Sequence, residues 1–273
     1  MPDNDSSGVG GGPGDPYSRV EYRRLIAWGD RIRREGPWLL ALLDGAPERS
    51  VVDLGPGTGE HTAFFADQGA RAVGVDASES MVEAAREHEA AGLGRFVLGD
   101  IRNADAVLVD EPPFGMAVCL GNVVPHLTGE DDLESLSRAV ARILLPGGRF
   151  LIQLLNYDRI LSQGIRHLPL NFRPGEAEEE IVFLRLMKPA SDGRVLFFPT
   201  TLSLDPTSDE PVAVSGSKRV ELRAWTAEDL TTSLEGAGFT VDLRGDMMGG
   251  AFHPESSNDV VVLATRKTSK GPA

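Results

Sequence analysis

The chain has 273 residues, which suits one large domain or one domain with a sizeable insertion, and 41% of them are hydrophobic, enough to bury a core. A formal net charge of −14 repels phosphate backbones, so nucleic acid is not an expected partner. No apolar run reaches the roughly 18 residues that a membrane helix needs, and the single cysteine, Cys119, excludes an internal disulfide and a cysteine-based zinc site.

The N-terminal segment divides into two parts by composition. Residues 1–16 are rich in Gly, Pro and Asp and predict a disordered tail, with neither the basic start nor the apolar stretch of a secretory signal. Residues 17–47 predict an amphipathic helical cap, in which Pro37 begins a second helix and Gly45 ends it. These features favour a cytoplasmic protein with no membrane segment and no metal.

Strands and helices then alternate along the chain. The predicted strands are 50–55, 71–76, 95–100, 114–121 and 149–155, and the predicted helices are 60–69, 78–92 and 130–148. This order predicts an α/β fold with a Rossmann-like, doubly wound, mostly parallel sheet of seven strands and helices on both faces. Such sheets bind ligands at the carboxyl ends of their strands.

The alternation stops near residue 160 and returns near residue 225. The intervening segment predicts an antiparallel β-meander of strands 178–189, 194–204 and 211–225, and the chain closes with a helix over 226–238 and strands over 239–246 and 259–267. We therefore expect a Rossmann-like core domain formed by 48–160 and 225–268 and an antiparallel β lid or substrate insert at 161–224.

The first strand–helix turn carries three glycines in the sequence VVDLGPGTGEH. Gly55, Gly57 and Gly59 leave room for a ligand against the backbone. In a dinucleotide site the third glycine would fall at position 60, where this chain has Glu60. A carboxylate there would repel a pyrophosphate, so the turn favours a ligand without phosphates and argues against a nicotinamide dehydrogenase.

Acidic residues end the next two strands. Asp76 lies 17 residues beyond Gly59, where an acid accepts hydrogen bonds from ribose hydroxyls. Asp100 ends the third strand, where a carboxylate accepts from an adenine amino group. The glycine turn and the two acids, at three successive strand ends, together indicate an adenosine-containing ligand.

This set resembles the class I S-adenosylmethionine-dependent methyltransferases, strongly over residues 50–155 and more loosely over 225–267. The resemblance implies that GPGTG packs against the methionine part of S-adenosylmethionine and that Asp76 holds the ribose. It also implies that Ala77 and Ile101 flank the adenine and that Met81 packs nearby. The product would be S-adenosylhomocysteine.

Strands four and five end in polar residues, in LGNVVPHL and NYDRIL. These two stretches resemble the glycine N-methyltransferase branch of the superfamily, which also has a β insert after strand five. The roles implied by this resemblance extend the site on two sides. Expected catalytic residues are Asn122, His126 and Tyr157; Leu120 and Arg31 would contact the cofactor; Tyr22, Trp28, Asn156 and Asp158 would contact the substrate.

One position departs from the pattern of the glycine enzymes. An arginine that grips the glycine carboxylate stands there directly before Asn-Tyr-Asp, and this chain has Leu155. Loss of a charge-assisted partner costs roughly 1.5–3 kcal/mol, which makes glycine itself a doubtful substrate. The arginines that could substitute for it are Arg159, Arg166, Arg173 and Arg223.

The sequence thus predicts a small-molecule methyltransferase, with an amine or an amino-acid-like molecule as acceptor. An O-methyltransferase, with His126 as base, is the alternative within enzymes, and a non-catalytic S-adenosylmethionine-binding protein is the alternative outside them. A nucleic-acid methyltransferase is disfavoured because strand four continues into Gly121-Asn122-Val123-Val124 rather than Asn/Asp-Pro-Pro-Tyr. The sequence makes no prediction of the oligomeric state.

Overall fold

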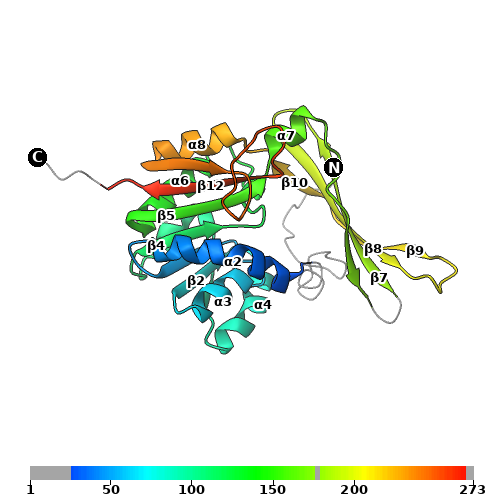
Figure 1. The fold of residues 1–273 in the computed structure, drawn as a ribbon, viewed down its shortest axis with the longest axis horizontal. Helices are drawn as coiled ribbons and strands as arrows, with labels where there is room; N and C mark the ends of the chain where they lie inside the picture. The colour runs from blue at the N-terminus through cyan, green and yellow to red at the C-terminus, as the bar shows by residue number, and fades with distance from the viewer. Residues whose placement is uncertain (1–25, 176–178, 269–273) are drawn as a thin grey trace, which may run out of the picture.

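The computed structural model describes residues 26–175 and 179–268. Two β-sheets organise these residues (Figure 1). The larger sheet forms the body of the molecule, and the smaller sheet stands at the end toward which the parallel strands point. The predicted tail 1–16, the first part of the predicted cap and Tyr22 lie outside the described residues.

The larger sheet is mostly parallel. Its strands are, in spatial order, β11 (Phe239–Arg244), β12 (Asp259–Arg266), β5 (Leu144–Leu155), β4 (Phe114–Cys119), β1 (Ser50–Leu54), β2 (Arg71–Asp76) and β3 (Arg95–Leu98). Only β12 runs against its neighbours β5 and β11. The strand order reverses at β1, which pairs with β2 on one side and β4 on the other. This reversal marks the ligand crevice of doubly wound sheets.

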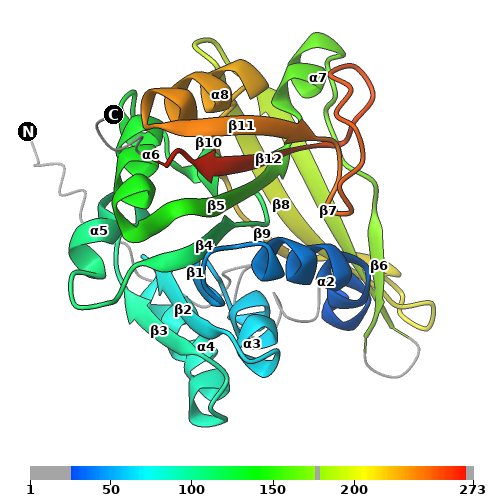
Figure 2. The same cartoon turned by 60° about the vertical axis from the view of Figure 1, so that its left-hand side comes forward.

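Helices cover both faces of this sheet, as predicted (Figure 2). One face is covered by α6 (Asp132–Ile143) and α8 (Ala227–Gly236), and the other by α2 (Trp28–Asp44), α3 (Glu60–Asp67) and α4 (Glu79–Ala90). Alternate residues of the central strands enter two apolar clusters, one under each helix layer. Val52 of β1, for example, packs on the α6 side, while Val51 packs with Leu39 of α2. The Rossmann-like fold class is confirmed.

The smaller sheet is antiparallel throughout and lies between β5 and α8 in the chain. Its strands are β6 (Asn171–Pro174), β7 (Glu180–Pro189), β8 (Arg194–Leu204), β9 (Val212–Ser217) and β10 (Val220–Arg223). The sequence predicted three strands and missed β6, and the predicted strand 211–225 is in fact two strands. Residues 218 and 219 interrupt that strand, so β9 and β10 pair with different parts of β8.

Two predicted helix boundaries, each near a proline, were wrong. The helix predicted over 130–148 ends at Ile143, because a residue before proline disfavours the helical region and Leu145 precedes Pro146. Leu144 instead pairs with Phe114 at the start of β5. Conversely, Pro37 does not begin a new helix but lies inside α2, at an exposed position.

Three short helical segments were not predicted. They are η1 (Ile101–Asn103) with α5 (Ala104–Val107), η2 (Val124–His126) and α7 (Tyr157–Ser162). Two helices begin with side-chain caps: the Ser78 hydroxyl accepts from the Met81 amide, and Thr226 forms a capping box with Asp229.

Candidate active site

A cavity of about 1260 Å³ lies between the carboxyl ends of the parallel strands and the smaller sheet. Ligand pockets commonly span roughly 300–1,000 Å³, so this one has room for two small molecules side by side. Ten of the residues predicted from the sequence line it. They are Arg31, Gly55, Gly57, Asp76, Ala77, Met81, Asp100, Ile101, Asn122 and His126.

The glycine turn after β1 faces this cavity with its backbone. Gly55 and Gly57 have φ values of +79° and +57°, which side chains rarely adopt, and both line the cavity. A Cβ on Gly55 would lie 2.6 Å from the Val123 side chain. Gly59 does not line the cavity; a Cβ there would lie 2.7 Å from the Phe96 ring, so this glycine allows α3 to pack on the sheet.

Asp76 is held in place by backbone amides of two turns, the one after β1 and the one after β2. Its carboxylate accepts hydrogen bonds from the amide of Gly57 (3.1 Å) and the amide of Ser78 (2.8 Å). Burial raises the pKa of Asp76, and these two bonds oppose the rise. A carboxylate offers about four lone-pair sites, so capacity remains for ligand hydroxyls on the cavity side. Ala77 and Met81 line the wall beside it.

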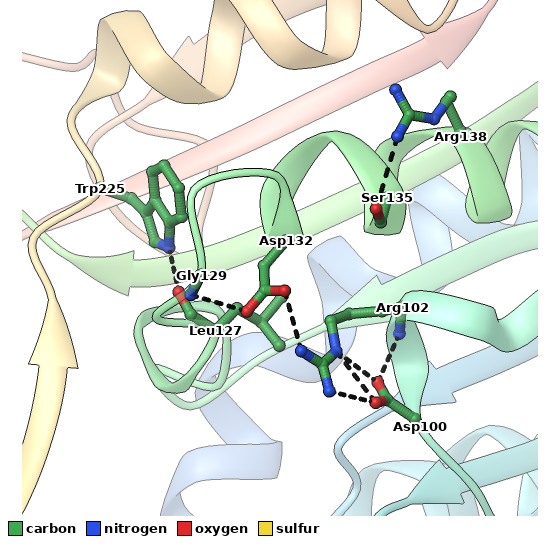
Figure 3. Close-up of polar contacts among 8 residues, drawn as sticks. All are labelled: Asp100, Arg102, Leu127, Gly129, Asp132, Ser135, Arg138 and Trp225. Carbon is green, nitrogen blue, oxygen red and sulfur yellow. Dashed lines mark hydrogen bonds and ion pairs between the residues drawn. The ribbon is translucent and has the colours of Figure 1, made fainter.

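Asp100 is part of a charged cluster at the end of β3 (Figure 3). The guanidinium of Arg102 donates to both Asp100 oxygens from Nε (3.0 and 2.9 Å) and to Asp132 from a terminal nitrogen (2.8 Å). Arg102 holds the pKa of Asp100 below its usual range. Asp132 also accepts from the amide of Gly129, which ties the cluster to the loop before α6. The sequence prediction of Asp100 did not anticipate Arg102.

The turn after β4 presents Asn122 in a left-handed conformation, with φ of +67°. The side-chain oxygen of Asn122 accepts from the amide of Leu155 (3.0 Å), and its nitrogen donates to the Tyr157 hydroxyl (3.2 Å). Tyr157 is fully buried and does not line the cavity, so it positions Asn122 from behind. Leu120 is buried in the apolar cluster under α2, and Gly121 lines the cavity instead.

His126 lies in η2 and faces the second sheet across the cavity. Its ring reaches solvent through the cavity but is surrounded by protein. Burial, with the positive charge of Lys218 as the second cause, lowers the pKa of His126. The imidazole is therefore neutral at neutral pH, with a lone pair able to accept a proton.

Asn156 and Asp158 have structural partners rather than a place on the cavity wall. Asn156 is fully buried, caps α7 through the Arg159 amide, and donates to the carbonyls of Pro254 and Ser257. Asp158 accepts from the Ala227 amide and so ties α7 to α8. Strand β5 ends at Leu155 and helix α7 begins at Tyr157, so Asn156 and Asp158 take part in the contacts of this helix and do not line the cavity.

Helix α2 brings a chain of charges to the cavity. Arg31 donates from Nε to both Glu35 oxygens at 3.1 Å, and His61 lies 3.3 Å from Glu35. A terminal nitrogen of Arg31 lies 3.9 Å from where a Cβ of Gly121 would be, which places it at the end of β4. Trp28 packs edge-on against His61 at 5.3 Å and does not line the cavity.

Several cavity residues were missed by the sequence analysis. Gln153 accepts from the Gly121 amide (2.7 Å) and hydrogen-bonds Asp259, whose pKa is raised by burial. A glutamine in the middle of the apolar run RFLIQLL was the available signal for Gln153. Of the four arginines named as possible carboxylate partners, Arg173 lines the cavity. No local signal distinguished the other lining residues of the smaller sheet and its connections, which are Leu168, Asn171, Phe183, Arg185, Phe197 and Lys218.

Asp53, in the middle of β1, lies beneath the glycine turn and is almost fully buried. It accepts a hydrogen bond from the Thr62 hydroxyl at 2.8 Å. Burial raises the pKa of Asp53 from 3.8 to about 6, although the charge of His61 and the Thr62 bond oppose the rise.

Two searches of the described residues bear on other functions. Within 26–175 and 179–268, no cluster of three or more His, Cys, Asp or Glu side chains is arranged to hold a metal ion. Over the same ranges, no helix has the combined length and apolar character needed to cross a membrane.

The family model described as a methyltransferase domain matches residues 51–148, which include the glycine turn, both acids and Asn122. The predicted resemblance to class I S-adenosylmethionine-dependent methyltransferases is confirmed over this region.

Among curated proteins, this region is similar to a glycine/sarcosine N-methyltransferase of Parasynechococcus marenigrum, with 32% identity over 52% of this chain and 51% of that protein. The chain therefore spans about half the length of that relative. A longer match, covering 74% of both chains at 27% identity, is to a dTDP-4-amino-2,3,4,6-tetradeoxy-D-glucose N,N-dimethyltransferase of Saccharopolyspora spinosa. The predicted likeness to the glycine N-methyltransferase branch is thus confirmed for the core region.

The whole fold, including the smaller sheet, is similar to the crystal structure of the sugar N-methyltransferase KedS8 from Streptoalloteichus sp ATCC 53650. The TM-score is 0.70, and the match covers 98% of this chain and 99% of that one at 23% identity. At this identity the likeness concerns the fold.

Proposed function

We propose that this protein is an enzyme that transfers a methyl group from S-adenosylmethionine to the nitrogen of a small-molecule amine. The observation that carries the proposal is the cavity itself. One wall has the glycine turn, Asp76 and Asp100 at successive strand ends, and the same cavity continues past Asn122 to the smaller sheet. A site for the cofactor alone would not need to extend to the smaller sheet.

The residues present fit S-adenosylmethionine. Asp76 has acceptor capacity for the ribose hydroxyls, and Ala77 and Ile101 would flank the adenine. Arg31 would pair with the cofactor carboxylate through its terminal nitrogens, since its Nε is held by Glu35. When bound, the cofactor supplies an electrophilic methyl group on a sulfonium, and the leaving thioether is neutral.

The chain's own task is to aim the acceptor and exclude water. Asn122 is fixed by Leu155 and Tyr157. Its side-chain oxygen accepts from the Leu155 amide at 3.0 Å and meets the Tyr157 hydroxyl only at 3.4 Å, so an amine N–H would compete with this longer contact for the second lone pair. Such a bond would turn the nitrogen lone pair toward the methyl carbon. A neutral amine needs no strong base. Methyl transfer to it would therefore require only that this hydrogen bond hold the amine nitrogen beside the methyl carbon.

An amino sugar is the acceptor we propose within the amines. The similarity to the dTDP-amino-sugar dimethyltransferase extends well beyond the core that the glycine enzymes match, to 74% of the chain against 52%. Leu155 lines the cavity at the position where the resemblance to glycine enzymes predicts an arginine. A free glycine carboxylate would therefore lack that partner at the end of β5.

O-methylation is the second candidate, and His126 is the observation that favours it. A hydroxyl acceptor must lose its proton during transfer, and the lowered pKa of His126 keeps its imidazole neutral and able to accept that proton. His126 lines the same cavity as Asn122.

The test is a methyl-transfer assay with labelled S-adenosylmethionine and matched acceptors. These would be an amino sugar linked to a nucleoside diphosphate, its hydroxyl analogue, the free amino sugar, and glycine with sarcosine. We expect transfer to the amino sugars and none to the hydroxyl analogue. Transfer to the hydroxyl analogue alone would replace the proposal with O-methylation. Cofactor binding without transfer to any acceptor would favour a non-catalytic binding protein.

A further inference from the structure

The wall formed by the smaller sheet has a regular pattern of side chains. On β7, Phe183 and Arg185 are two residues apart and both line the cavity. Successive side chains of a strand point to opposite faces, so these two share the inner face. The partners across the strands agree: Phe183 pairs with Asn171 of β6, which also lines the cavity. Leu186, on the opposite face, is exposed.

Three cations occur on this inner face. Arg173 is two residues beyond Asn171 on β6, and its Nε is buried without a hydrogen-bond partner among the described residues. Arg185 pairs in register with Pro199 of β8, and the Lys218 amide donates to the carbonyl of the same Pro199 at 3.1 Å. Arg185 and Lys218 therefore lie beside the same residue of β8, and both line the cavity.

The charge of this wall is opposite to that of the whole chain. The formal net charge of the protein is −14. Among the described residues of the smaller sheet and its connections, those that line the cavity include Arg173, Arg185 and Lys218 and no carboxylate. The cavity's acids, such as Asp76, Asp100 and Asp259, all come from the other wall.

The cationic wall is close to the place of methyl transfer. Lys218 is near enough to His126 for its positive charge to contribute to the lowered pKa of the imidazole. His126, Asn122 and Lys218 all line the cavity. An acceptor with its amine at Asn122 would thus extend toward Arg185 and Lys218. Phe183 and Phe197 line the same wall and supply apolar surface between the charges.

We propose that Arg173, Arg185 and Lys218 form a subsite for an oxyanion on the methyl acceptor, and that this oxyanion is a phosphate or diphosphate. Guanidinium groups bind phosphate and carboxylate oxygens with paired, charge-assisted bonds. Three cations match the charge of a diphosphate better than that of one carboxylate. The subsite deepens the proposed function and rests on it, because it assigns the ligand to the acceptor rather than to the cofactor.

The test uses the full chain saturated with S-adenosylhomocysteine, so that the cofactor compartment is filled. Inorganic pyrophosphate, and separately acetate, would be titrated by calorimetry into the wild type and into Arg173→Gln, Arg185→Gln and the double variant. Arg194→Gln is the matched control, since Arg194 lies on the same sheet, pairs with Glu221 and does not line the cavity. The S-adenosylhomocysteine affinity of each variant reports whether it is folded.

We expect pyrophosphate to bind the wild type and the control equally. Each cavity variant should bind it at least tenfold more weakly, at unchanged S-adenosylhomocysteine affinity. Equal pyrophosphate affinity of the wild type and the double variant would overturn the subsite. Tighter binding of acetate than of pyrophosphate would overturn the phosphate assignment in favour of a carboxylate.

The two proposals fail in different ways. If S-adenosylhomocysteine does not bind the wild type, the proposed function is overturned. If it binds and pyrophosphate does not distinguish the variants, only the subsite is overturned. With a nucleoside-diphosphate amino sugar as acceptor, Arg185→Gln should raise KM at least tenfold and leave kcat within about threefold, whereas a merely structural defect would lower both.

Discussion

The two walls of the cavity are built in different ways. The wall from the parallel sheet consists of turns at strand ends, where Gly55, Asp76 and Asn122 are fixed by backbone hydrogen bonds or by positive φ angles. The wall from the antiparallel sheet consists of side chains at alternate positions of paired strands, such as Phe183 and Arg185.

Under the proposed function, the first wall would bind the cofactor and the second wall would bind the acceptor. The methyltransferase domain model matches residues 51–148 and so includes the first wall and none of the second. A turn at a strand end tolerates few side chains, because its geometry depends on particular backbone conformations. A position on a paired strand tolerates many, so the second wall is free to differ between enzymes that share the first.

The largest expected effect is on the first wall. Asp76→Ala removes the acceptor of the ribose hydroxyls and of the Gly57 and Ser78 amides. Hydrogen bonds to a charged group are worth roughly 1.5–3 kcal/mol each, so cofactor affinity should fall about a hundredfold or more. Calorimetry with S-adenosylhomocysteine measures this directly. An affinity unchanged from the wild type would remove Asp76 from the cofactor site.

The second effect concerns the foundation of that wall and depends on pH. The folded-state pKa of Asp53, about 6, is above its ordinary 3.8, so the folded protein binds this proton more tightly than the unfolded chain. The resulting stabilisation is complete below about pH 4 and is lost as the pH rises through about 6. As the pH rises from about 4 to above 6, the free energy of unfolding of Asp53→Asn should therefore increase by up to about 3 kcal/mol relative to that of the wild type.

Urea unfolding of both proteins at a series of pH values measures this difference. Asp67→Asn is the control, because Asp67 is an exposed carboxylate at the end of α3. A difference between Asp53→Asn and the wild type that stays constant with pH would show that the pKa of Asp53 is the same in the folded and the unfolded protein.

The third effect is at the junction of the two walls. Asn122→Gly removes the amide but keeps the left-handed backbone free of strain, since glycine adopts φ near +67° readily. We expect kcat to fall about tenfold or more, the usual loss for one positioned hydrogen bond of about 1.4 kcal/mol or more. Cofactor affinity should change little.

Tyr157→Phe provides the comparison for that variant. It removes only the hydroxyl that bonds the Asn122 nitrogen from behind, so its loss of kcat should be smaller. Equal losses of kcat and cofactor affinity in Asn122→Gly would assign Asn122 to cofactor binding instead.

The smallest effect is expected at the Arg102 cluster. Arg102→Gln leaves Asp100 and Asp132 without their shared cation, but Arg102 is 42% exposed, and exposed ion pairs contribute about 1 kcal/mol or less. Cofactor affinity should therefore change by no more than about fivefold. A loss as large as that of Asp76→Ala would mean that Arg102 itself contacts the cofactor.

The parallel sheet could be predicted closely from the sequence. Alternating apolar strands and capped helices are local patterns, and Ser78 and Thr226 cap two of these helices. The positions of Gly55, Gly57, Asp76 and Asn122 on the cavity follow from the same patterns, because the carboxyl ends of parallel strands meet at one edge.

Predictions failed where a residue's role depends on what it packs against. Asn156 and Asp158 follow a buried strand, as ligand-binding residues do, yet α7 directs them to Pro254 and Ala227, 98 and 69 positions along the chain. Leu120 and Gly121 are neighbours, and only the orientation of β4 against α2 decides which of them faces the ligand.

The amino-acid sequence alone was sufficient to predict the fold class and the strand ends that line the cavity. These depend on short-range regularities: the spacing of apolar residues, glycines at turns, and acids at strand ends. The cationic wall depended on the tertiary structure. Arg173, Arg185 and Lys218 come from separate segments, and strand pairing across β6, β7 and β8 places them on one face. A shift of register by one residue would turn each strand's side chains to the other face, and no local pattern specifies that register.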